Sequence, residues 1–188
     1  MIVLTLDLGT RCGFCFGPAG ELPWSGTWLL KRPKEAPSVA FGNLLEALAS
    51  QFVRCKPDLV VKEAPMNLAG MSDKMSASDT VRMTFGLHAV VEAACERFGV
   101  RCEDVADSTV RKHFTSKGRW GDRSVTKRKV LERCWQLGYF PRDCYDEDRA
   151  DACACFDWAI STLARSPPRV LTLFPPQAEP KKRRAARC

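Results

Sequence analysis

The stretch IVLTLDLGTRCGFCFG, residues 2–17, opens the chain with two apolar segments separated by a Gly-Thr turn. Short apolar runs bounded by glycine indicate strands, so we predict strands over residues 2–7 and 13–17 that pair as a hairpin. The first strand ends in Asp7, a single acid in an otherwise apolar run. Two chemistries use such an arrangement: the acid can hold a metal ion, or the turn after it can enclose a nucleotide phosphate.

The rest of the chain alternates between strand and helix patterns. Further strands are predicted over 24–30, 57–63 and 100–106. Helices are predicted from Ser38, as a cap, to a stop at Pro57, and over 79–98, 125–137 and 147–163. Residues 110–124 are predicted to form a basic loop containing Gly118 and Gly121. This order predicts an α/β fold, with a five-stranded mixed sheet flanked by helices. The first three strands would form an antiparallel meander, with the other two parallel to the first.

The chain has 188 residues, a formal net charge of +7 and a pI near 9.0. We predict one domain over residues 1–165 and a mobile, basic, Pro-rich tail over 166–188. The charge favours an anionic partner, with nucleic acid the commonest, although a solvated basic surface would have the same composition. No export signal and no apolar run of about 20 residues is present. We therefore expect a cytoplasmic protein with no membrane partner.

Ten cysteines include a C-x-x-C at Cys12 and Cys15 and a C-x-C at Cys153 and Cys155. A zinc site normally places such pairs at loop tips. Here both pairs lie inside apolar segments, the first in a strand pattern and the second in a helix pattern. We therefore predict small buried thiols rather than a zinc site.

Acidic residues follow two apolar strands and begin the last helix. Asp7 and Glu63 each end a strand, and if these strands are parallel neighbours both acids emerge at the same edge of the sheet. Asp148 and Asp151 are three residues apart at a helix start, so they share one face. Any of these acids alone could be a cap or a surface residue. Four converging carboxylates repel one another unless a cation lies among them, and oxygen ligands suit Mg²⁺ or Mn²⁺.

The turn after Asp7 also resembles the first phosphate loop of the actin and sugar-kinase superfamily. That superfamily builds two such domains around a cleft, which takes about twice this length. It also needs a second Asp-x-Gly turn, and none follows Glu63. The kinase interpretation is therefore disfavoured, and the metal interpretation is preferred.

The acids stand in an order that resembles the RuvC-type Holliday-junction resolvases of the ribonuclease-H-like superfamily. The matching segments are LTLDLGT around Asp7, LVVKEAP around Glu63 and DRADACA with Asp148 and Asp151. GLHAVVEAA resembles the long helix of that family, and VRKHFTSKGRWGDRSVTKRKV its basic, Gly-containing loop and following helix. The resemblance covers about residues 2–163. Leu8 stands where the family usually has Pro, and Met66 where bacterial members often have an aromatic residue, which suggests a divergent, phage-like member.

The resemblance implies a metal-dependent endodeoxyribonuclease that resolves four-way DNA junctions by paired, symmetric nicks. It implies two Mg²⁺ ions per active site, with Mn²⁺ able to substitute, held by Asp7, Glu63, Asp148 and Asp151. Two cuts in one junction require two active sites, and hence a homodimer. The apolar residues of the helix over 79–98 could supply its interface, although core burial would also explain them. A bacterial or phage-infected host is expected.

Basic residues of the predicted loop and helix are expected to contact DNA phosphates. They are Arg111, Lys112, Lys117, Arg119, Lys127, Arg128 and Lys129. Lys127 matches the K-x-x-V of the family and is expected to act directly at the scissile phosphate. Trp120 could stack on an unpaired base or pack beneath the loop, and Met66 could wedge into the branch point. A solvated helix face is the alternative for the whole basic run.

Two other functions are compatible with the sequence. A nuclease of the same fold could act on flaps, forks or RNA instead of four-way junctions. A catalytically silent DNA-binding module belongs to a different class, and it is disfavoured because four converging acids would repel DNA in the absence of metal. Cleavage of branched DNA on addition of Mg²⁺ separates these alternatives.

Overall fold

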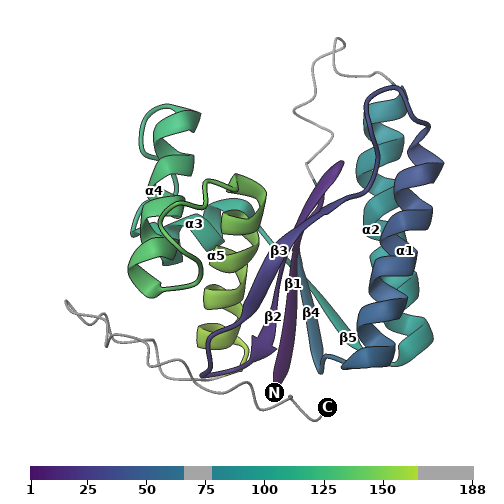
Figure 1. Cartoon of the computed structure of the whole chain (residues 1–188), viewed down its shortest axis with the longest axis horizontal. Helices are drawn as coiled ribbons and strands as arrows, with labels where there is room; N and C mark the ends of the chain where they lie inside the picture. Colours follow the sequence, from purple (N-terminus) through teal and green to yellow (C-terminus); the bar gives the residue numbers. More distant parts are fainter. Residues whose placement is uncertain (66–77, 165–188) are drawn as a thin grey trace.

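A computed structural model describes residues 1–65 and 78–164 of the chain. Its centre is a mixed five-stranded sheet with the strand order β3-β2-β1-β4-β5 (Figure 1). The strands are β1 (Ile2–Asp7), β2 (Arg11–Pro18), β3 (Trp24–Leu29), β4 (Leu59–Glu63) and β5 (Arg101–Val105). β1 pairs antiparallel with β2 and β2 with β3, whereas β4 is parallel to both β1 and β5. The predicted fold class and sheet arrangement are confirmed.

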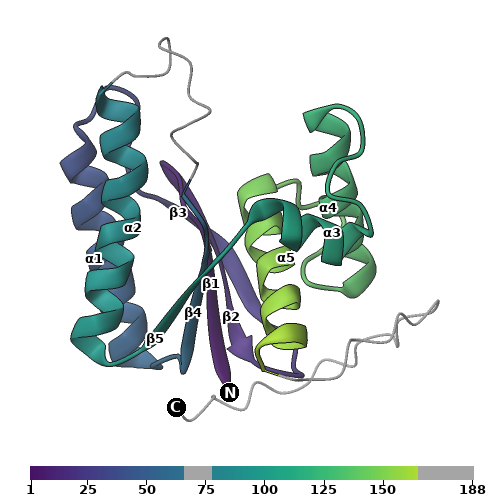
Figure 2. The same cartoon turned by 180° about the vertical axis from the view of Figure 1, so that it is seen from behind.

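The helices cover the two faces of this sheet (Figures 1 and 2). On one face lie α1 (Pro37–Arg54) and α2 (Ser78–Phe98). On the other lie α3 (Asp107–Thr115), α4 (Arg123–Leu137) and α5 (Glu147–Thr162). In the described residues, no helix is both long enough and apolar enough to span a membrane.

Two predictions about the helices are wrong. The predicted cap at Ser38 is not used, because α1 begins at Pro37 after Ala36 and no side chain caps it. Proline suits a first helical position because its missing N–H would have no partner there. The first part of the predicted basic loop, residues 110–115, belongs to the helix α3, which has buried apolar residues only at Val110 and Phe114. Two apolar residues four apart are too few to reveal a helix by their periodicity.

The sheet separates two apolar cores because successive side chains of a strand point to opposite faces. Val3 and Val61 pack with α3, α4 and α5, while Leu4 and Val60 pack with α1 and α2. Cys12 and Cys15 fall on opposite sides in this way, so the C-x-x-C cannot hold one zinc ion. Cys153 and Cys155 are buried in α5, and the prediction of buried thiols is confirmed for all four.

Candidate active site

Asp7 and Glu63 end two neighbouring strands at the same edge of the sheet. β1 and β4 are parallel, and their register pairs Leu6 with Lys62, the residue before each acid. Asp7 and Glu63 therefore project to the same face as Val3 and Val61, which is the face that α3, α4 and α5 cover. The predicted meeting of these two acids at one edge agrees with the structure.

The beginning of α5 is held directly against β1 and β2. A Cβ atom on Gly13 would lie 1.9 Å from the main-chain oxygen of Asp148, so this close approach requires glycine. The hydroxyl of Thr5 donates a hydrogen bond of 2.7 Å to the main-chain oxygen of Ala152. At the edge strand, Thr27 donates a hydrogen bond of 2.7 Å to the cap residue Asp146. These contacts fix the first turns of α5, with Asp148 and Asp151, beside the end of β1.

Three of the predicted acids perturb one another strongly. Burial, together with Asp151 and Asp148, raises the pKa of Asp7 to about 7 from its ordinary 3.8. Burial and the neighbouring Asp7 raise the pKa of Glu63 to about 8. Burial also raises the pKa of Asp151 to about 6, although nearby Arg111 and Lys127 oppose this rise. The structure thus brings Asp7, Glu63 and Asp151 together as mutually repelling carboxyl groups.

Asp148 differs from the other three acids because it has a direct ion pair. Its Oδ2 lies 2.9 Å from Nε of Arg11, a residue of the β1–β2 hairpin that the sequence analysis did not select. Arg11 also lies 3.6 Å from Asp146. Arg11 follows the Gly-Thr turn, so only its position opposite α5 distinguishes it from an ordinary turn residue.

Asp107 is a fifth carboxylate of this site, and the sequence analysis missed it. It begins α3 directly after β5, and its charge raises the pKa of Asp7, Glu63 and Asp151. Its Oδ2 lies 2.5 Å from Nη1 of Arg111, and Arg111 in turn lowers the pKa of Glu63 and Asp151. The available signal was similar to that of Asp7: an acid two residues after the end of a strand that runs parallel to β1.

Lys127 lies at the edge of the acid cluster. Its Nζ is 2.7 Å from Oε2 of Glu147, and its side chain is only 16% exposed. Its charge opposes the rise in the pKa of Asp7 and of Asp151, which places the ammonium near both. Lys127 is therefore the residue of α4 that the structure brings to the predicted site.

The other basic residues fall into two groups. Arg128 and Lys129 both pair with Glu132 on their own helix, at 3.6 and 2.7 Å. Within the described part of the chain, Lys112, Lys117 and Arg119 have no ion pair. The charge of these three residues is available to an anion without breaking an ion pair.

Trp120 packs within the loop before α4. Its indole Nε1 donates a hydrogen bond of 3.0 Å to Thr115, and the ammonium groups of Lys117 and Lys129 lie 4.6 and 5.9 Å from the ring centre. These contacts agree with the packing role considered for Trp120, and its stacking on a base stays a prediction. Met66 and the tail over 166–188 lie outside the described residues.

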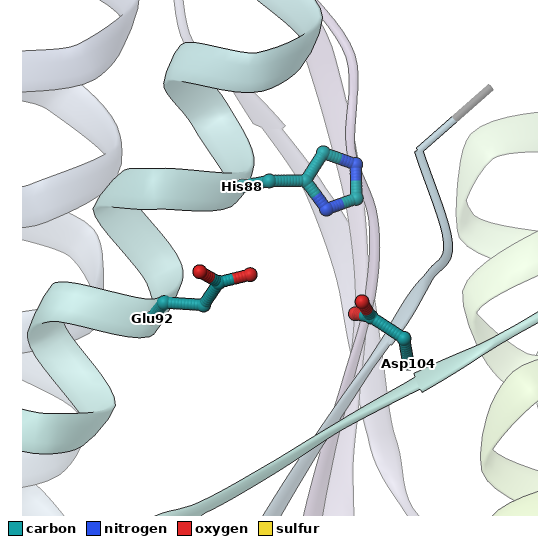
Figure 3. Close-up of side chains that lie close together, drawn as sticks. All are labelled: His88, Glu92 and Asp104. Atoms are coloured by element: carbon teal, nitrogen blue, oxygen red, sulfur yellow. The ribbon is translucent and has the colours of Figure 1, made fainter. Parts of the chain in front are cut away.

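A second acidic cluster occupies the other face of the sheet (Figure 3). His88 and Glu92 of α2 and Asp104 of β5 each offer one ligand atom, and these atoms lie within 4.8 Å of one another. The acids around Asp7 do not form a group as tight as this in the residues described. The ammonium of Lys62, 1% exposed, lies against both carboxylates and is 2.9 Å from Glu92. A built-in cation thus already neutralises this cluster.

The cluster around Asp7 fits a bound divalent cation better. Its donors are oxygen atoms from Asp7, Glu63, Asp148 and Asp151, the type of ligand that Mg²⁺ and Mn²⁺ prefer. The pKa values of its three partly buried carboxyl groups stay raised although Lys127 and Arg111 lower them, so the protein's own cations offset the rise only in part. A divalent cation would supply the charge that Lys62 supplies to the second cluster.

No protein-family model and no curated protein sequence matches the chain. Among solved structures, that of RuvC from Thermus thermophilus is similar, with a TM-score of 0.61 and 16% identity over 82% of this chain and 90% of that one. The same protein in complex with a Holliday junction substrate has a TM-score of 0.61 and 14% identity, over 82% and 89% of the two chains. This chain has a RuvC-type resolvase fold. The yeast mitochondrial Holliday junction resolvase Ydc2 is also similar, with a TM-score of 0.51 and 15% identity over 81% of this chain and 74% of that one.

The RuvC-type fold agrees with the resemblance found in the sequence. At identities of 14–16% the likeness concerns the fold, and the chemistry must be argued from the side chains of this chain. Those side chains place the acid cluster at the carboxyl ends of β1 and β4, where an α/β sheet commonly carries its functional site.

Proposed function

We propose that the protein is a metal-dependent endonuclease that cuts branched DNA, with four-way junctions as the preferred substrate. The observation that carries this proposal is the convergence of Asp7, Glu63 and Asp151 on a RuvC-type sheet, with their pKa values raised to about 7, 8 and 6. A structural role gives no reason to keep three partly buried acids together with their charges only partly offset, whereas a hydrolase that works on phosphate through a cation needs them.

The proposed ligands are Asp7, Glu63, Asp148 and Asp151, holding two Mg²⁺ ions per site, with Mn²⁺ able to substitute. When bound, these cations would supply an activated water and charge stabilisation at the scissile phosphate. Arg11 keeps the carboxylate of Asp148 in place through their ion pair of 2.9 Å. Arg111 does the same for Asp107, at the margin of the site.

Lys127 is proposed to act at the scissile phosphate. Its ammonium is near Asp7 and Asp151 and is held at 2.7 Å by Glu147, so it is positioned before substrate arrives. A positioned cation stabilises the charge that develops on phosphate during hydrolysis. Phosphates farther along the DNA would meet the remaining basic residues, which are Arg111, Lys112, Lys117, Arg119, Arg128 and Lys129. Trp120 and Met66 would contact bases near the branch point.

A homodimer forms part of the proposal because two symmetric cuts need two active sites. Leu87 and Val91 of α2 are buried against the protein's own core. Phe85 is 37% exposed on the same helix, so part of its apolar surface remains available to a second subunit. Acting on DNA in recombination or repair, the protein would work in the cytoplasm of a bacterium or of a phage-infected host.

A cleavage assay with four substrates tests the function directly. Full-length protein is incubated with a four-way junction, a flap, linear duplex and an RNA–DNA hybrid, in Mg²⁺, in Mn²⁺ and in EDTA. We expect paired nicks in opposite strands of the junction, with either metal and not with EDTA. Faster cutting of flaps or hybrids would assign the same chemistry to another substrate. Binding of junctions without cleavage in either metal would overturn the proposal in favour of a binding module.

A further inference from the structure

A pocket of about 640 Å³ lies between α3, the loop after it and α5, outside the acid cluster. Its lining comes from Ser108, Thr109, Lys112, His113, Gly118 and Trp158. Trp158 follows Asp151 by seven residues on α5, or two helical turns, which separates the pocket from the acids by about 10 Å along the helix. The volume is in the range of pockets that hold a small ligand.

The helix α3 connects the pocket with the active site. Residues four apart share a helix face. Asp107 and Arg111 form the face beside the acid cluster, and the next residues, Ser108 and Lys112, form a neighbouring face that lines the pocket. A DNA strand that leaves the acid cluster across α3 would therefore meet this pocket next.

The charges around the pocket favour an anion. Lys112 has no ion pair in the part of the chain that the structure describes, so its ammonium is available. The nearby Asp107 is paired with Arg111. Asp157 accepts a hydrogen bond of 2.6 Å from the hydroxyl of Tyr139 and lies 3.0 Å from Nε2 of His113. Both neighbouring carboxylates are thus engaged by other groups, and neither pairs with Lys112.

The remaining lining suits a nucleotide better than a simple anion. The hydroxyl groups of Ser108 and Thr109 can donate to phosphate oxygens beside the ammonium of Lys112. The indole of Trp158 forms an apolar wall, and a base can stack on an aromatic ring whatever its sequence. The contact of His113 with Asp157 holds the imidazole in one orientation. Cation, hydroxyls and ring together match one phosphate and one unpaired base.

We infer that this pocket binds a nucleotide unit, a phosphate with its unstacked base, of a DNA strand that passes over α3 from the active site. The inference rests on the proposed function for the identity of the strand, but its binding test does not require cleavage. It assigns Lys112 and Trp158 to substrate positioning, at a site separate from the four proposed metal ligands.

Binding of fluorescein-labelled dT8 to the full-length protein in EDTA tests the inference, because no cleavage occurs there. Ser108→Glu introduces a carboxylate into the pocket at an exposed position of the first turn of α3, so the fold should be kept. Ser38→Glu is the matched control, since Ser38 is the exposed second residue of α1 on the opposite face of the sheet. Both variants change the net charge equally.

We expect Ser108→Glu to weaken binding of dT8 at least about 10-fold and Ser38→Glu to weaken it less than about 3-fold. Trp158→Leu should weaken it about 5- to 100-fold through lost stacking. Equal effects of the two glutamates would overturn the inference. So would unchanged binding by a Trp158→Leu protein with wild-type thermal unfolding.

Calorimetric titration with free dTMP distinguishes binding of a free nucleotide from binding of a nucleotide unit within a DNA strand. Binding of dTMP that Ser108→Glu abolishes would show that the pocket takes a nucleotide unit without a strand. Binding of dT8 alone, with the same sensitivity to Ser108→Glu, would assign the pocket to a DNA strand. Junction cleavage in Mg²⁺ is measured on the same proteins. If the wild-type protein did not cleave the junction, the proposed nuclease function would be wrong. The binding of dT8 in EDTA would still test whether the pocket binds a nucleotide unit.

Discussion

Lys62 and Glu63 are adjacent residues of β4, yet they belong to two acidic clusters on opposite faces of the sheet. On the face of α2, Glu92 and Asp104 surround the buried ammonium of Lys62. On the face of α5, Glu63 joins Asp7 and Asp151, and no comparably buried cation lies among them in the described residues. Both clusters are acidic, but only the first has a buried counter-ion of its own in the described residues.

The difference separates a structural role from a chemical one. The ammonium of Lys62 neutralises Glu92 and Asp104 within the folded chain. Its hydrogen bonds to these two carboxylates raise the pKa of Lys62, although burial opposes this rise. The acids around Asp7 remain unsatisfied, and two of them have pKa values raised by three units or more. A protein tolerates such repulsion where an external cation relieves it, so the unsatisfied cluster is the candidate for catalysis.

The largest effect should come from removing one acid of the α5 face. Asp7→Asn, Glu63→Gln and Asp151→Asn are each expected to reduce junction cleavage by more than about 1,000-fold, because each removes a proposed metal ligand. Junction binding in EDTA should stay within a few-fold of wild type, since it depends on the basic residues. Parallel loss of binding and cleavage in all three variants would contradict the assignment. Asp148→Asn should be severe but less so, because Arg11 already holds Asp148.

The next effect concerns the cation at the margin of this cluster. Lys127→Ala is expected to slow cleavage by roughly 10- to 1,000-fold at saturating protein, since a positioned ammonium stabilises charge on the phosphate. Arg128→Ala is the control on the same helix, because its side chain is 79% exposed and pairs with Glu132. Single-turnover rates measure both. Equal slowing by the two variants would show that Lys127 acts through general charge.

A change in the cluster on the α2 face should lower the stability of the protein and leave its cleavage rate unchanged. Lys62→Met removes the buried ammonium and leaves Glu92 and Asp104 without it, which we expect to cost about 1–3 kcal/mol in the free energy of unfolding. Urea unfolding measures this change, and cleavage at a temperature where the variant is folded should match wild type. A large loss of cleavage in a folded Lys62→Met protein would show that the two clusters do not have separate roles.

Adding zinc to the Lys62→Met variant tests whether the acidic cluster on the α2 face can itself hold a metal ion. Without Lys62, the ligand atoms of His88, Glu92 and Asp104 are free to hold a metal ion, so Zn²⁺ should raise the unfolding temperature of Lys62→Met. The rise should disappear in Lys62→Met with His88→Ala. A rise that persists without His88 would place the bound zinc elsewhere.

The smallest effect is the pH dependence of the metal-free protein. The pKa values of Asp7 and Glu63 are higher in the folded chain than in the unfolded chain, so the folded state keeps these protons longer. The free energy of unfolding contributed by these groups is therefore full below about pH 4 and is lost as the pH rises to about 8. In EDTA, Asp7→Asn should reduce this loss and gain about 1–3 kcal/mol over wild type at pH 8 relative to pH 5. Urea unfolding at the two pH values measures the difference, and a gain that is larger at pH 5 would contradict the sign.

Local patterns in the sequence were enough to predict the strands, the meander of the first three and the acids that end two of them. Alternating apolar residues and turn glycines are local signals, and the acids Asp7 and Glu63 stand out because charge is unusual at the end of an apolar strand. The same reasoning placed Asp148 and Asp151 on one face of a helix. It failed for α3, since Val110 and Phe114 alone make too weak a periodic pattern.

Which charges neutralise one another depends on contacts that exist only in the folded chain. Arg11 meets Asp148 because Gly13 lets α5 approach the hairpin, and Asp107 joins the site because β5 lies next to β4. Lys62 looked like an ordinary polar residue of a strand, but α2 and β5 bring two carboxylates to it. Such pairs join residues far apart in the chain, so their energies depend on distance and burial in the folded protein, which no local pattern contains.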